Sequence, residues 1–171
     1  LSFWSDAADL PPDTAGDGDE VTLGGAAYEL SLPRTIYTYT GSGAANEVDL
    51  TASAHALHED TTAITKTMLG DASMTDAERT FYLQWARGVD VKDEDGDDEV
   101  TDIRRFMSDP LHTKPKVITY GGTEEAPDIT LFVGTNEGHL MAIDTDDGSE
   151  VFSFMPQELL PNIPTLFEDS A

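Results

Sequence analysis

The stretch from Leu131 to Phe154, LFVGTNEGHLMAIDTDDGSEVFSF, places the strongest constraint on the fold of this chain. Three short runs, residues 129–134, 139–144 and 150–155, are rich in the β-branched and aromatic residues typical of strands. The segments TNEG and DTDDGS separate them and supply the Asn, Asp and Gly that tight hairpin turns require. We therefore predict a three-stranded meander, and further strands must pair with its edges because such a small sheet is not stable alone.

The N-terminal half is predicted to surround this sheet with a loop, a strand and a small helical insertion. Residues 1–49 form a leading segment, in which residues 1–20 are a loop rich in Asp, Gly and Pro and residues 34–40 are a strand. Residues 50–89 form the insertion, with one helix over residues 50–69 and a second that begins at a capping box formed by Thr75 and Glu78. The second helix is expected to pack through its apolar face, which carries Ala77, Phe81, Trp85 and Ala86.

The C-terminal half continues with two further segments. Residues 90–116 are an acidic loop and connector, and residues 117–171 hold a strand near 117–120, the meander and a Pro-rich exit loop with one short helical turn. The fold class predicted from this order is mainly β with a small α-helical insertion.

Charge excludes several classes of partner. The chain carries 34 Asp and Glu residues against nine Lys and Arg, a formal net charge of −25. This balance argues against nucleic acid, whose phosphates need basic side chains, and against anionic membrane surfaces. It permits divalent cations and suits a secreted protein in saline water, where mobile ions screen the repulsion. No run approaches the roughly 20 apolar residues of a membrane span, and the absence of cysteine excludes thiolate chemistry.

The meander resembles the repeat of quinoprotein-type β-propellers. In that repeat a Gly-containing turn precedes LxAxD, a second turn follows, and an aromatic residue closes the strand. Here Gly138, the run from Leu140 to Asp144, Gly148, and Phe152 or Phe154 occupy those places. Several blades of this kind are needed to close a propeller ring, yet this chain contains one blade-like unit and no second copy. We therefore expect the chain to be a propeller fragment whose remaining blades belong to other polypeptide.

Four separated motifs narrow the resemblance. GDEVTLGGAAYELSLPRTIYTYTG, WARGVDVKDEDGDD, RRFMSDPLHTKPKVITYG and FVGTNEGHLMAIDTDDGSEVFSFMPQELLPNI occur here in one order, over roughly residues 17–166. Together they are similar to the PilC/PilY family of type IV pilus tip-associated proteins. The resemblance implies an extracellular, pilus-tip adhesin or assembly factor that acts as a non-enzymatic propeller scaffold. Its partners would be the remainder of the same protein, minor pilins, and a host or abiotic surface.

The acidic run at residues 93–102 is the strongest candidate metal site. Asp93, Asp95 and Asp97 have the 1-3-5 spacing of an EF-hand calcium loop, and Glu99 or Asp102 could complete the oxygen shell around Ca²⁺. Two departures weaken the pattern: the sixth place is Asp98 rather than Gly, and the twelfth is Arg104 rather than Glu. The alternative is a solvated acidic loop. The second acidic run, residues 144–147, is better explained as a hairpin turn.

The sequence contains no recognisable catalytic motif. The four histidines, at positions 55, 58, 112 and 139, have no metal motif or nucleophile beside them. His55 and His58 would share one face of the helix predicted over residues 50–69. A quinoprotein dehydrogenase fragment is an alternative, but the two tryptophans, Trp4 and Trp85, lie outside the blade-like unit. A secreted propeller unrelated to pili is a further alternative.

Overall fold

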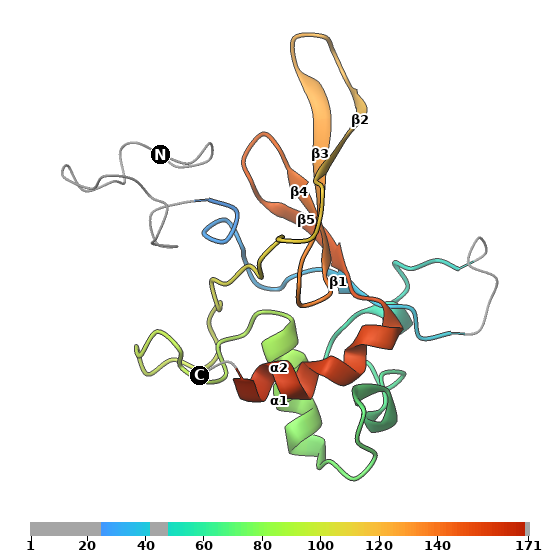
Figure 1. The fold of residues 1–171 in the computed structure, drawn as a ribbon, viewed down its shortest axis with the longest axis vertical. Coiled ribbons are helices and arrows are strands. Elements are labelled where there is room, and N and C mark those ends of the chain that lie inside the picture. Colours follow the sequence, from blue (N-terminus) through green and yellow to red (C-terminus); the bar gives the residue numbers. More distant parts are fainter. Residues whose placement is uncertain (1–24, 42–47, 170–171) are drawn as a thin grey trace.

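The computed structural model describes residues 25–41 and 48–169. The loop predicted for residues 1–20 lies outside the described residues, as does most of the loop predicted after Thr40. Figure 1 shows a sheet with a long projecting hairpin on one side of the molecule and a helical part on the other. The chain ends in the helical part, so the last strand of the sheet leads directly into it.

Five strands of the described chain form one mixed sheet. They are β1 (Ile36–Tyr37), β2 (Lys116–Gly122), β3 (Pro127–Gly134), β4 (Leu140–Asp144) and β5 (Glu150–Phe154). Their order is β1-β5-β4-β3-β2, with β1 parallel to β5 and every other pair antiparallel. The predicted meander and the strand before it are confirmed as the consecutive strands β2 to β5. Only two residues of the strand predicted over 34–40 pair with the sheet.

The meander turns form as their residues predict. Gly138 and Gly148 adopt φ angles of 92° and 83°, a left-handed conformation that costs glycine little. The first turn is closed by the Thr135 amide donating to the His139 carbonyl at 2.8 Å. The second is closed by the Asp144 amide donating to the Ser149 carbonyl at 2.9 Å. Local turn chemistry therefore sets the register of β3, β4 and β5.

The two faces of the sheet differ in what covers them. On one face Val133 and Met141 are register partners, and they pack with Ile143 and Leu30 in a buried cluster. The other face carries a row of aromatic rings in contact across the strands, with centroid separations of 6.2 to 6.5 Å: Tyr37, Phe152, Phe132 and Tyr120. We call this the aromatic face. The small side chain of Ala142, between Phe132 and Phe152 in the register, lets the two rings meet over it.

Helix α1 (Asp76–Ala86) begins at the predicted capping box. Thr75 Oγ1 accepts a hydrogen bond from the Glu78 amide at 3.1 Å, and the Glu78 carboxylate accepts one from the Thr75 amide at 2.6 Å. Its buried face differs from the predicted one. Leu83, Trp85 and Ala86 are buried, whereas Phe81 is 50% exposed and Ala77 is exposed. The helix therefore meets the core mainly through its last turn.

The helix predicted over residues 50–69 is wrong. The segment contains only the short 3₁₀ turns η2 (Ser53–His55) and η3 (Lys66–Leu69). Residues 55–57 run beside β1, where the His55 carbonyl accepts from the Thr38 amide and the Leu57 amide donates to the Ile36 carbonyl, and the chain then passes through turns to η3. These bonds to β1 take up backbone groups that a helix would have used.

The predicted exit loop is more helical than expected. It holds η4 (Gln157–Asn162), a 3₁₀ turn, and α2 (Ile163–Asp169). Pro164 is tolerated because it stands in the first turn of α2, where its missing N–H has no helical partner to lose. Phe167 of α2 contacts the rings of Tyr82 and Trp85 in α1 edge-on, at 5.2 and 5.8 Å. Together α1 and α2 enclose the larger core of the molecule, which includes Leu83 and Leu160.

Candidate functional site

The acidic loop is anchored at its base to the end of α1. Val89 and Ile103 form an antiparallel bridge, and the Arg104 amide donates to the Gly88 carbonyl at 2.7 Å. Next to this bridge the Asp90 amide donates to the Asp102 carbonyl at 3.1 Å. Residues 91–101 therefore form a closed loop whose two ends are fixed by backbone hydrogen bonds.

Three predicted ligands converge within this loop. A carboxylate oxygen from each of Asp93, Asp95 and Asp97 lies within 4.8 Å of the others. Asp93 is half-buried, and the other two are exposed. Carboxylate oxygens are the donors that Ca²⁺ prefers, and these three could supply part of its shell of six to eight oxygens. No other acidic or histidine group of this kind occurs in the described residues.

The loop backbone turns around these carboxylates. Asp93 Oδ1 accepts from the Asp98 amide at 3.1 Å, and Asp97 Oδ1 accepts from the Glu99 amide at 2.8 Å. Asp98 adopts a φ of 69°, the left-handed conformation for which an EF-hand loop uses Gly at the same place. Asp tolerates this conformation better than most residues do, so the chain can turn at Asp98 although Gly is absent there.

The remaining predicted ligands stand apart from the triangle. Glu99 is exposed and outside the group of converging oxygens. Asp102 is half-buried, and its Oδ1 makes no hydrogen bond among the described residues. Desolvation by the surrounding loop, together with the charges of Asp97, Asp102 and Asp90, raises the pKa of the exposed Asp95. A cation bound here would relieve that mutual repulsion.

Arg104, at the twelfth place, is directed into the core instead of into the loop. Its guanidinium lies over the Trp85 ring at 4.0 Å and over the Phe106 ring at 4.9 Å. The nearest carboxylate oxygen is Glu94 Oε1 at 3.8 Å, and this same oxygen accepts from Trp85 Nε1 at 3.3 Å. Glu94 thus connects the acidic loop to the indole of Trp85, which is 2% exposed.

The second acidic run behaves as a turn. Asp144 Oδ1 accepts from the Asp146 amide at 2.8 Å, and Asp147 Oδ1 accepts from the Ser149 amide at 2.9 Å. Hydrogen bonds from the hydroxyl and the amide of Ser149 lower the pKa of Asp147. The carboxylates are occupied in shaping the hairpin, as expected from the sequence.

The histidines do not form a site. His55 and His58 lie outside any α-helix, and their Nδ1 atoms accept from the amides of Thr40 and Asp60 at 3.2 and 3.1 Å. His112 contacts the side chain of Asn136 at 3.2 Å. His139 is buried, and burial next to two arginines lowers its pKa to about 3.

A buried charge cluster was missed by the sequence analysis. Arg34 donates to Glu150 through Nε at 2.9 Å and Nη2 at 2.7 Å, across 116 positions of sequence. Beside this pair, Arg104 and His139 line a cavity of ≈ 10 Å³, room for about one water molecule. Arg104 Nε and His139 Nδ1 make no hydrogen bond among the described residues. Burial raises the pKa of Glu137, which lines the same cavity.

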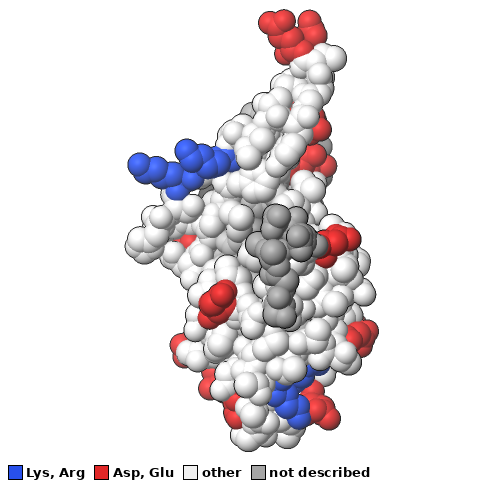
Figure 2. Space-filling model, turned by 90° about the vertical axis from the view of Figure 1, so that its right-hand side faces the viewer, with Lys and Arg blue, Asp and Glu red and all other residues white. Residues whose placement is uncertain are grey.

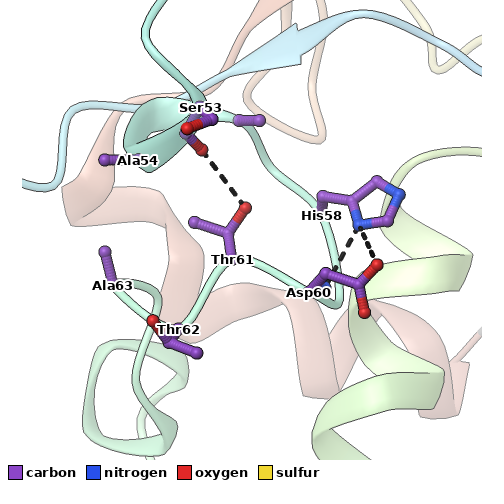
Figure 3. A pocket seen from close by; sticks show the side chains of 8 residues that line it. Ser53, Ala54, His58, Asp60, Thr61, Thr62 and Ala63 are labelled. Atoms are coloured by element: carbon purple, nitrogen blue, oxygen red, sulfur yellow. Dashed lines mark hydrogen bonds and ion pairs between the residues drawn. The ribbon is translucent and has the colours of Figure 1, made fainter.

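A wider hollow of ≈ 430 Å³ opens on the surface between η2 and the loop that follows it (Figure 3). Its polar groups are paired with each other: Thr61 Oγ1 donates to the Ser53 carbonyl, and His58 accepts from the Asp60 amide. The remaining lining includes Ala54 and Ala63. The hollow presents no nucleophile paired with a base.

Comparisons with protein-family models, with curated proteins and with solved structures give no match for this chain. Within the described residues, none of the helices combines the length and the apolar character needed to cross a membrane.

Proposed function

We propose that this chain is the first blade and leading segment of a secreted β-propeller scaffold of the PilC/PilY type, which supports pilus assembly and surface attachment by binding rather than by catalysis. The main support for the proposal is the strand order of the sheet. Strands β2 to β5 form a consecutive four-stranded antiparallel meander with one face on the core. A propeller blade is a four-stranded sheet of this kind.

The aromatic face supports an origin in a larger assembly. Ile118, Tyr120 and Leu140 are 44%, 63% and 42% exposed on it, beside the half-buried rings of Phe132 and Phe152. An apolar patch of this type on a soluble protein marks an interaction surface. In a propeller, the adjacent blade covers it, since sheets pack face to face at about 10 Å.

The pilus assignment rests on the four motifs that resemble the PilC/PilY family. The scaffold is proposed over the dehydrogenase alternative because Trp85 is buried between Arg104 and Phe167 and offers no open ring for a quinone. Trp4, the other tryptophan, lies outside the described residues. A secreted propeller unrelated to pili would have the same blade. The pilus proposal and this alternative differ in their partners, so minor pilins should co-purify with the natural gene product only under the pilus proposal.

Calcium regulation is the second part of the proposal. The oxygens of Asp93, Asp95 and Asp97 would form the core of a Ca²⁺ site, with Glu99 or Asp102 reaching it after a local rearrangement. Calorimetric titration of the chain with CaCl₂ should give saturable heat that Asp95→Ala abolishes. Asp146→Ala is the matched control, since it removes an Asp from the hairpin turn. Equal heats for all three proteins would show that the loop is a solvated acidic surface and does not bind Ca²⁺.

The scaffold proposal is tested on the natural gene product. Mass spectrometry of the protein purified from its source should find peptides that continue past Ala171. Leu140→Glu should then weaken surface attachment by the cells, because it places a charge on the aromatic face. Ala77→Glu, on the exposed side of α1, should leave attachment unchanged. A natural product that ends at Ala171 and remains a monomer would rule out the propeller.

A further inference from the structure

The outer edge of β2 is open to a further strand. Among the described strands β2 pairs with β3 alone, and all of its residues are exposed. In Figure 1 the β2–β3 hairpin projects away from the rest of the molecule. The regular part of β2 runs from Lys116 to Thr119, before the bulge between Thr119 and Gly121. Over this stretch the edge presents backbone N–H and C=O groups that can bind an added strand.

Two lysines at this edge differ from the other basic side chains of the described chain. Seven of the nine Lys and Arg residues are engaged within the molecule by carboxylates, backbone carbonyl oxygens or aromatic rings, as Arg34 is by Glu150 and Arg87 is by Glu59. Lys114 and Lys116 are exposed and make no ion pair, hydrogen bond or ring contact with any described residue. Their charges are therefore available to a partner.

The surroundings of these lysines are locally basic in a strongly acidic chain. No Asp or Glu occurs from Pro110 to Thr123, although the net charge of the whole chain is −25. The length of β2 separates Lys116 from the acidic turn at Glu124, about 20 Å at about 3.3 Å per residue. That separation exceeds the Debye length of about 8 Å at 0.15 M salt. Figure 2 shows the acidic tip of the molecule and, below it, a separate basic group that projects from the surface.

We propose that the outer edge of β2 binds an extended acidic segment of a partner polypeptide, which pairs antiparallel with β2 and joins the sheet. Antiparallel pairing is slightly more stable per residue than parallel pairing. The partner sets carboxylates opposite Lys114 and Lys116 and apolar side chains opposite Val117 and Ile118, and cross-strand pairs of these kinds stabilise a sheet. Lysines on an edge strand repel basic partners, so they select an acidic one.

This edge is distinct from the surface that the propeller proposal assigns to a neighbouring blade. Blades pack through the faces of their sheets, so a neighbour on the aromatic face would leave the outer edge of β2 open. Binding at the edge can therefore be measured on the 171-residue chain, whatever covers the aromatic face.

Two capped peptides of equal composition test the pairing. Thr-Val-Val-Asp-Thr-Asp matches β2 when it runs antiparallel, with its aspartates opposite the two lysines. The reversed sequence, Asp-Thr-Asp-Val-Val-Thr, carries the same charge but sets its aspartates at the other end. In amide NMR spectra of the chain, the first peptide should shift the signals of Lys116 to Thr119 saturably, with a Kd at least about tenfold below that of the reversed peptide. Equal Kd values would show non-specific charge attraction and overturn the proposal.

A pair of double variants separates the lysines from net charge. Lys114→Gln with Lys116→Gln removes two positive charges and takes the net charge from −25 to −27. Ala72→Glu with Ala77→Glu, at exposed positions of the helical part, adds two negative charges and reaches the same −27. The lysine variant should bind the first peptide at least about tenfold more weakly, because two cross-strand pairs of opposite charge are lost. The alanine variant should bind it as the natural sequence does, and an equal loss in both variants would contradict the proposal.

Two further outcomes of the same NMR experiment would also overturn the proposal. If neither peptide gives saturable shifts, the lysines only guard the edge against pairing. If the signals of Lys116 to Thr119 shift as the concentration of the chain rises without peptide, a second copy of the chain occupies the edge in place of an acidic partner.

Discussion

Replacing Glu59 with Gln tests the strongest ion pair of the helical part. The Glu59 carboxylate accepts from Arg87 Nε at 2.8 Å and Nη2 at 2.7 Å, and from Gln84 Nε2 at 3.2 Å. Burial raises the pKa of Glu59, but these hydrogen bonds outweigh it and lower the pKa from 4.5 to about 2. Gln keeps the size of the side chain and removes its charge, which leaves the buried Arg87 without its counter-ion.

The expected loss of stability follows from this pKa. A difference of about 2.5 between the two pKa values corresponds to about 3.4 kcal/mol, at about 1.36 kcal/mol per unit. Solvent reaches one side of the pair, and screening reduces the expected effect to about 1–2 kcal/mol. Because the folded pKa of Glu59 is the lower one, this stabilisation is present above pH 4.5 and is lost as the pH falls towards 2.

Urea unfolding of the natural sequence and of Glu59→Gln at several pH values measures the effect. The difference in unfolding free energy should be about 1–2 kcal/mol at pH 7 and should approach zero near pH 2, by the linkage given above. Glu158→Gln is the control, since Glu158 is exposed and contacts no basic side chain of the described residues. A difference that stays constant between pH 7 and pH 2, or one equal to that of the control, would refute the reasoning.

Three further substitutions test the packing around the sheet and the helices. Arg79→Met removes three hydrogen bonds to backbone carbonyls of residues 59–64 and should cost about 2–4 kcal/mol in urea unfolding; a smaller loss than for Arg79→Lys would contradict this. Gly122→Ala sets a methyl group in steric conflict with the Ala126 carbonyl oxygen, at a φ of 82°. It should speed amide exchange throughout β2, and unchanged exchange would show that the turn adapts. Leu83→Ala, at a fully buried position, should cost about 2–5 kcal/mol, and a cost below about 1 kcal/mol would place Leu83 outside the core.

Local chemistry explains what the sequence could predict. The hairpin turns depend on Gly138 and Gly148, and the start of α1 depends on Thr75 and Glu78, all of which act within a few residues. The convergence of the Asp93–Asp97 carboxylates also follows from spacing within one loop.

Long-range contacts explain what the sequence could not predict. The segment over residues 50–69 is not a helix because Arg79 takes three of its carbonyls and β1 takes further backbone groups. The pairing of Arg34 with Glu150 joins opposite ends of the described chain and leaves no local pattern. The burial of Arg104 against Trp85 likewise depends on how the acidic loop folds back over α1.

The most direct test of the account asks whether further polypeptide covers the aromatic face. A single cysteine at Leu140 of the cysteine-free chain reports on this face, and one at Ala77 reports on the exposed side of α1. The propeller proposal predicts that a maleimide labels Leu140→Cys readily in the 171-residue chain and at least about tenfold more slowly in the natural gene product, which this proposal expects to be longer, with Ala77→Cys labelled equally in both. Equal labelling of Leu140→Cys in the two proteins would contradict it.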